Sequence, residues 1–158
     1  MLLQIDGWVF DVDEEGTRER SALELAEHCS CKNCQNFYAA FGTFCPHLGP
    51  FLARFGLFWD APDRMSPVEY TLDRVDYDPQ YHVFGTILEY GKTPMSAGNV
   101  TVTAQPSEGL LEGKPCFTLL VSDISLPWVL DPKDFDDPNI PQRNIFSRIF
   151  RKNPNIPQ

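Results

Sequence analysis

The sequence of 158 residues has no long hydrophobic run. A membrane-spanning helix needs about 18 or more consecutive apolar residues, and no segment approaches that length. Residues 1–6 have neither the basic region nor the apolar region of a secretion signal. We therefore expect a cytoplasmic protein that does not associate with a membrane.

Basic side chains are scarce relative to acidic ones. The 13 lysines and arginines stand against 22 aspartates and glutamates, which gives a formal net charge of −9. Nucleic acids attract positively charged surfaces, so this balance argues against a nucleic-acid partner. We expect a protein partner or self-association instead.

Recognisable catalytic motifs are missing as well. No serine lies in a Gly-x-Ser-x-Gly elbow, and the three histidines, His28, His47 and His82, are dispersed without an obvious nucleophile partner. Residues 11–16 begin like a calcium-binding loop, but its twelfth position is Ala22, where a bidentate glutamate is needed. Enzymatic activity is thus undecided, and the sequence favours a non-catalytic protein without an obligatory cofactor.

The patterning predicts one α+β domain. Hydrophobic residues make up 42% of the chain and charged residues 22%, a composition typical of a globular protein. A Ser-x-x-Glu capping box at Ser21 and a stripe of apolar side chains from Cys34 to Phe44 indicate helices early in the chain. The expected helices cover residues 21–28, 31–44 and 51–56, the second with Ser30 as a plausible N-cap; the expected strands cover 5–12, 68–75, 81–90, 100–104 and 116–121. We therefore expect an antiparallel sheet of about five strands with two or three N-terminal helices packed on one face.

The composition changes after residue 130. Residues 131–141 are acidic and broken by prolines, so we expect an extended spacer there. Residues 143–158 hold four of the 13 bases and none of the acids, with apolar side chains spaced to form one helical face. The prediction is a single domain over residues 1–130, followed over 131–158 by a spacer and a short basic tail that becomes ordered only by docking.

The densest group of reactive side chains is the run from His28 to Cys34, followed by Cys45-Pro46-His47. Thiolate and imidazole are the ligands that tetrahedral zinc prefers, which makes a zinc site a hypothesis. Its candidate ligands are Cys29, Cys31, Cys34, Cys45 and His47. A helix over residues 31–44 is about 20 Å long, however, and would keep the last two ligands away from the first three. We therefore expect no stoichiometric zinc.

Two other interpretations of the cysteines stay open. Cys31-Lys32-Asn33-Cys34 at a helix N-terminus suits thiol redox chemistry, since amide dipoles and Lys32 favour a thiolate, although thioredoxin-like motifs follow a strand. The simplest alternative is that the thiols are small buried side chains packed beside Phe37 and Phe41. His82 is expected to be a strand residue with a satisfied ring.

Several short motifs together resemble a family of small uncharacterised bacterial proteins. They are an Ile-Asp-Gly-Trp strand at residues 5–8, a Cys-x-Cys-x-x-Cys-x-Asn-Phe motif at 29–37, a Tyr-His-x-Phe-Gly strand at 81–85 and Pro-Trp-Val-Leu at 127–130. The resemblance implies a bacterial, soluble, single-domain protein of unknown function and supplies no activity or ligand. Our leading interpretation is a non-catalytic cytoplasmic domain that binds a protein or another ligand. The alternative is a zinc-binding or thiol-redox protein that uses Cys29, Cys31 and Cys34.

Overall fold

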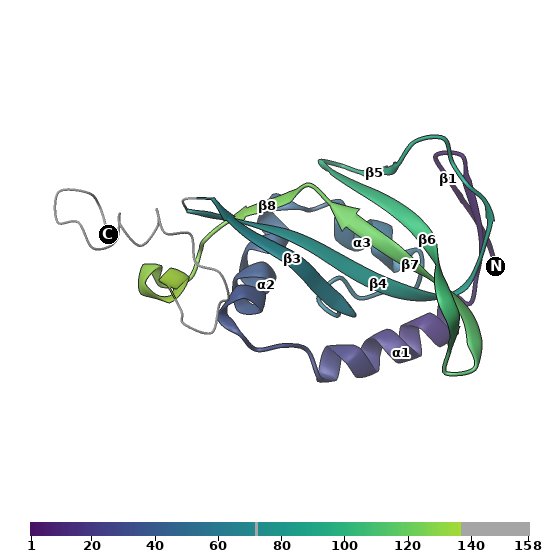
Figure 1. Cartoon of the computed structure of the whole chain (residues 1–158), viewed down its shortest axis with the longest axis horizontal. Helices are drawn as coiled ribbons and strands as arrows, with labels where there is room; N and C mark the ends of the chain where they lie inside the picture. Colours follow the sequence, from purple (N-terminus) through teal and green to yellow (C-terminus); the bar gives the residue numbers. More distant parts are fainter. Residues whose placement is uncertain (72, 137–158) are drawn as a thin grey trace.

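The computed structural model describes residues 1–71 and 73–136 (Figure 1). These residues form three α-helices, eight β-strands and one short 3-10 helix, so the predicted α+β class with an antiparallel sheet is confirmed. The predicted number of about five strands is wrong. The elements are β1 (Leu2–Ile5), β2 (Trp8–Val12), α1 (Glu14–Ala26), α2 (Lys32–Phe44), α3 (Leu48–Ala53), β3 (Arg64–Thr71), β4 (Arg74–Glu89), β5 (Met95–Ala97), β6 (Val100–Leu111), β7 (Lys114–Ser122), β8 (Ile124–Pro127) and η1 (Pro132–Asp136).

The 16-residue strand β4 organises the sheet. The strand order is β1-β2-β4-β7-β6-β5, and both β3 and β8 also pair with β4. The first part of β4 pairs with β3 and β8, its middle with β7 and its last part with β2. Alternate β4 residues, including Val75, Tyr77 and Tyr81, are buried in the core. One long strand therefore joins all the parts of the fold.

Tight turns explain part of the difference between the predicted and the observed number of strands, because two of the predicted strands contain a chain reversal. The predicted strand over residues 5–12 is a hairpin of β1 and β2, because Asp6 and Gly7 adopt positive φ angles of 50° and 86° and reverse the chain. The predicted strand over residues 68–75 contains the turn between β3 and β4, where Thr71 is paired with Arg74. An apolar run alone does not reveal a reversal inside it.

The first helix begins earlier than predicted. Asp13 is the N-cap of α1, and its carboxylate accepts a hydrogen bond of 3.0 Å from the Gly16 amide. The Ser21-x-x-Glu24 pattern therefore lies inside the helix and is not a capping box. Ser21 is buried, and its hydroxyl accepts a hydrogen bond from the Phe58 amide. Ser21 therefore takes part in a tertiary contact and does not cap the helix.

Helix α2 matches the predicted helix over residues 31–44, although its N-cap is Cys31 and not Ser30. Phe37 and Phe41 bury their rings in the core, where Phe41 stacks on Trp59 with centroids 4.1 Å apart. Helices α2 and α3 lie behind the strands in the view of Figure 1, while α1 runs below the sheet. The Thr17 hydroxyl of α1 accepts a hydrogen bond from the Phe84 amide of β4. Helix α1 thus contacts the backbone of the long strand directly.

The chain after Leu130 differs from the predicted extended spacer. Pro132–Asp136 form a 3-10 helix, and the Phe135 ring is 2% exposed. That ring packs edge-on against Tyr70 and Trp128, with centroids 5.6 and 5.2 Å away. The packed region therefore extends past residue 130 to at least Phe135. The predicted basic tail over residues 143–158 lies outside the described residues. None of the described helices combines the length and the apolar character that crossing a membrane requires.

Candidate metal centre

Three of the five cysteines meet at the amino end of α2. Cys29 and Cys31 come from the loop between α1 and α2, and Cys34 comes from the first turn of α2. Their sulfur atoms all lie within 4.8 Å of one another. Cys29 and Cys31 are exposed, whereas Cys34 is buried, and all three are free thiols. The arrangement offers three soft ligands to one ion from a site open to solvent.

Local hydrogen bonds shape the loop that brings these thiols together. Cys31 has extended backbone angles and is the N-cap of α2, and its amide donates a hydrogen bond of 3.4 Å to the Cys29 sulfur. The Gln35 amide donates to the Cys31 carbonyl at 2.9 Å, and the Gln35 side chain donates to the Ser30 carbonyl at 2.6 Å. The Cys-x-Cys-x-x-Cys spacing thus turns the loop back onto the start of the helix.

A buried polar network fixes the first turn of α2 to the sheet. The Asn36 side chain donates to the Tyr77 hydroxyl at 3.2 Å and to the Pro127 carbonyl at 3.1 Å, and it accepts from the Val129 amide at 2.7 Å. The Tyr77 hydroxyl donates in turn to the Asn33 carbonyl at 2.8 Å. Because Cys34 lies between Asn33 and Asn36 in the chain, these hydrogen bonds hold the backbone that carries its side chain.

The environments of the thiols differ. The hydrogen bond from the Cys31 amide stabilises a thiolate at Cys29 and lowers the pKa of that group. Burial instead raises the pKa of the Cys34 thiol, and the neighbouring sulfurs act in the same direction. The site therefore combines an exposed thiol whose pKa is lowered with a buried thiol whose pKa is raised. A bound cation would favour the thiolate form of both.

Two aromatic rings border the cluster. The Tyr38 hydroxyl donates a hydrogen bond of 3.0 Å to the Cys29 carbonyl. The His28 ring stacks on the Tyr38 ring, with centroids 4.5 Å apart and an interplanar angle of 12°. Burial raises the pKa of Tyr38, and the nearby thiols add to the effect. Sequence reasoning did not identify Tyr38 as part of the site; its place one turn after Cys34 was the available signal.

The structure separates the other two predicted ligands from the cluster. Cys45 is the C-cap of α2, at the far end of a 13-residue helix that is about 20 Å long. It is buried, which raises its pKa. His47 is the N-cap of α3 and lies against Gly98, where an added Cβ would come within 2.5 Å of its ring. The five candidate ligands therefore divide into a group of three and two residues outside it.

The other chemical hypotheses have different outcomes. The thiols of Cys29 and Cys31 are exposed, so the interpretation of all three thiols as buried packing is wrong. His82 lies on β4 with its Nδ1 atom 3.1 Å from the Thr118 hydroxyl, as expected for a strand residue with a satisfied ring. The remaining cysteine, Cys116, is buried on β7.

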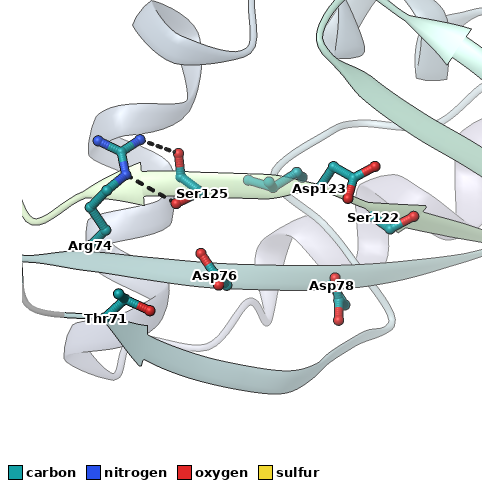
Figure 2. A pocket seen from close by; sticks show the side chains of 8 residues that line it. Thr71, Arg74, Asp76, Asp78, Ser122, Asp123 and Ser125 are labelled. Carbon is teal, nitrogen blue, oxygen red and sulfur yellow. Dashed lines mark hydrogen bonds between the residues drawn. The ribbon is translucent and has the colours of Figure 1, made fainter. Parts of the chain in front are cut away.

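A polar hollow of about 640 Å³ lies over β4 and β8 (Figure 2). Asp76, Asp78 and Asp123 line it together with Arg74. The Arg74 guanidinium donates to the hydroxyl and the carbonyl of Ser125, at 3.0 and 2.6 Å. Arg74 is therefore held against β8, and the half-buried Asp76 and Asp78 and the exposed Asp123 line the hollow beside it.

Comparisons of the chain with known protein families, curated proteins and solved structures found no match. The resemblance to a family of small bacterial proteins therefore stays a prediction. The thiol cluster is the arrangement from which a function is argued.

Proposed function

We propose that this protein is a non-catalytic metal-binding protein that holds a thiophilic ion, zinc above all, with Cys29, Cys31 and Cys34. The observation that carries the proposal is the mutual approach of the three sulfur atoms to within 4.8 Å. Zinc–sulfur bonds of about 2.3 Å place the sulfurs of a tetrahedral site about 3.8 Å apart. The cluster therefore needs to contract by only about 1 Å to hold the ion. The proposal departs from the expectation of no stoichiometric zinc, which assumed that Cys45 or His47 must complete the site.

The exposure of the thiols also favours a ligand-binding role. Cysteine is among the residues most often buried, and a purely structural thiol gains stability by packing. Cys29 and Cys31 are nevertheless exposed beside the buried Cys34. The amide groups at the start of α2 favour negative charge there, and a bound cation offsets the repulsion among three thiolates. This supports a site built for an ion rather than for packing.

Thiol redox chemistry is the second candidate function. The lowered pKa of Cys29 makes it the nucleophilic thiol of the cluster, and Cys31 and Cys34 are close enough to form a disulfide after small movements. The two functions differ in what they require. A metal site needs all three thiols in one complex, whereas a redox site needs one attacking thiol and one resolving thiol.

The test is metal stoichiometry together with competition titration. The full chain is purified without chelator under reducing conditions, its zinc content is measured, and zinc is titrated against a chromophoric chelator. We expect about one zinc per chain and the loss of at least about tenfold in affinity in Cys31→Ser. Cys116→Ser, which removes a thiol on β7, is the matched control and retains the metal.

Two results would contradict the proposal. The first is a reduced wild-type protein that does not bind zinc in the titration, and the second is a Cys31→Ser variant with wild-type affinity. If the protein that fails to bind zinc loses two free thiols on mild oxidation, the redox function replaces the metal function. A protein partner or self-association stays a prediction alongside either function, as does the cytoplasmic location.

A further inference from the structure

The thiol cluster leaves one coordination position of zinc to be filled. Structural zinc sites are almost always tetrahedral, with four protein ligands. Within residues 1–71 and 73–136, no fourth cysteine, histidine or carboxylate joins the group of Cys29, Cys31 and Cys34. The fourth ligand must therefore be a side chain that moves into the site or a molecule from solvent.

We infer that His28 is the fourth ligand and that its ring leaves Tyr38 to close a Cys3His zinc site. The inference rests on the proposed function, since it specifies how the same three thiols hold their ion. His28 directly precedes Cys29 in the chain, so its backbone is already at the cluster. The geometry that carries the inference is the contact of its ring with Tyr38, whose hydroxyl bonds the Cys29 carbonyl.

The His28 ring is available for this movement. It is exposed, and in the described part of the chain the ring stacks on Tyr38 and makes no hydrogen bond or ion pair. It lies between α1 and α2, outside any helix or strand, and its amide donates only a long bond of 3.4 Å to the Leu25 carbonyl. Rotation of the side chain therefore gives up one ring contact and no buried hydrogen bond.

The division of the site between helix α2 and the loop before it supports the same inference. Cys34 and Tyr38 belong to α2, which Asn36 fixes to the sheet. His28 and Cys29 belong to the loop, which is tied to this frame through the Tyr38 hydroxyl. An ion bound by the three thiols would thus have the His28 imidazole close by, on the residue next to Cys29.

The other two imidazoles of the chain do not compete for this position. His47 lies beyond the far end of α2, and His82 lies on β4 with its ring bonded to Thr118. The imidazole of His28 is neutral when it binds a metal, so a Cys3His site carries one negative charge less than a site with four thiolates. This suits a chain in which acidic residues already outnumber basic ones.

Cobalt(II) substitution of the full chain tests the inference, because cobalt reports geometry and ligand type separately. The sulfur-to-cobalt charge-transfer absorption follows the number of thiolates, and the visible d–d bands follow tetrahedral geometry. In His28→Ala we expect the charge-transfer absorption to persist, the d–d bands to shift to lower energy as water, a weaker-field ligand, replaces the imidazole, and zinc affinity to fall at least about tenfold. His47→Ala is the matched control and should match the wild type.

A second variant and a direct observation complete the test. His28→Cys should keep intense d–d bands and raise the charge-transfer absorption by about one third relative to the wild type, since four cobalt–sulfur bonds replace three. The ring nitrogen signals of His28 in a ¹H–¹⁵N spectrum should shift on addition of zinc, which needs no variant at all. Unchanged ring signals together with wild-type spectra in His28→Ala would overturn the inference and leave the proposed function intact. A wild-type protein that binds neither cobalt nor zinc would overturn both.

Discussion

The hydroxyl of Tyr38 donates a hydrogen bond of 3.0 Å to the backbone carbonyl of Cys29. This single bond joins the cysteine loop to the same helix that carries Cys34. It acts on the backbone of a proposed ligand and not on its sulfur. Tyr38 is therefore a positioning residue for the cluster, and its contribution can be separated from that of the thiols.

Replacement of Tyr38 by phenylalanine should weaken zinc binding while the fold is retained. Tyr38→Phe removes the hydroxyl but keeps a ring for His28 to stack on, so only the tie to Cys29 is lost. A hydrogen bond of this kind is worth about 0.5–1.5 kcal/mol, which corresponds to about a two- to tenfold loss of affinity. Competition titration with a chromophoric chelator measures it. Tyr90→Phe, which removes an exposed hydroxyl just after β4, is the control, and equal affinities of the two variants would disprove the role of Tyr38.

Asn36 should matter more for stability than any other polar side chain near the cluster. Its fully buried amide group bonds the Tyr77 hydroxyl and the backbone at Pro127 and Val129. Asn36→Ala removes all of these hydrogen bonds and leaves the Tyr77 hydroxyl only its bond to the Asn33 carbonyl, so we expect unfolding to become easier by about 2–4 kcal/mol. Urea unfolding of the metal-free protein measures the change.

The matched control for Asn36 is Asn99. Asn99 is exposed and donates one hydrogen bond of 3.2 Å to the Phe44 carbonyl. Asn99→Ala should therefore change the free energy of unfolding by about 1 kcal/mol or less. If the two variants unfold at the same urea concentration, the network around Asn36 does not fix α2 to the sheet.

How far the sequence predicts this molecule depends on whether a feature is local or tertiary. Helix α2 was predictable, because its apolar stripe repeats every three or four residues. The long β4 and its partners were only partly predictable, since a strand pairs with residues far away in the chain. Ser21 illustrates the difference: its pattern suggests a helix start, but its hydroxyl serves the distant Phe58 amide.

The candidate site follows the same rule. The closeness of Cys29, Cys31 and Cys34 is a consequence of short spacing at a helix start, and the helix length that separates Cys45 from them is also local information. The support from Tyr77 was not predictable, because Tyr77 lies on β4. The placement of the His28 ring on Tyr38 depends on how the loop folds back onto α2, which no spacing rule specifies.

Gly85 should tolerate no side chain where β4 leaves its pairing with β7 and joins β2. Its φ angle is +143°, and an added Cβ would lie 2.0 Å from the Asp11 carbonyl oxygen. Gly85→Ala therefore forces the two strands apart, and we expect a loss of more than about 2 kcal/mol in stability.

Gly42 offers the contrast, since it lies within α2 and a Cβ there meets no atom within 4 Å. Gly42→Ala should raise the melting temperature, with a gain of up to about 1 kcal/mol. Thermal unfolding of both variants measures the difference, and a stable Gly85→Ala protein would contradict the strand geometry.

The stability of the metal-free protein should fall as the pH rises above the ordinary thiol pKa of 9.0. Burial raises the pKa of Cys34, so the folded protein keeps this proton at a pH at which the unfolded chain releases it. The stabilisation is complete below the unfolded-state pKa and is lost as the pH rises through the higher folded-state pKa, by at most about 1.4 kcal/mol per pH unit for one group.

Cys29 acts in the opposite direction. Its pKa is lowered in the folded protein, so its contribution is present above the ordinary thiol pKa and is lost as the pH falls through the folded-state value. Urea unfolding between about pH 7 and about pH 10 separates the two thiols, because Cys34→Ala should flatten the fall above the ordinary thiol pKa, whereas Cys29→Ala should remove a gain in stability below that pKa and leave the alkaline fall unchanged. The fall does not vanish in Cys34→Ala, since burial also raises the pKa of Cys45 and of Tyr77.

Zinc competes with protons for the thiolates, so saturating zinc should remove the Cys34 contribution in the wild type. An alkaline slope that is the same in the wild type, in Cys34→Ala and with zinc would show that Cys34 is not the buried thiol of the site.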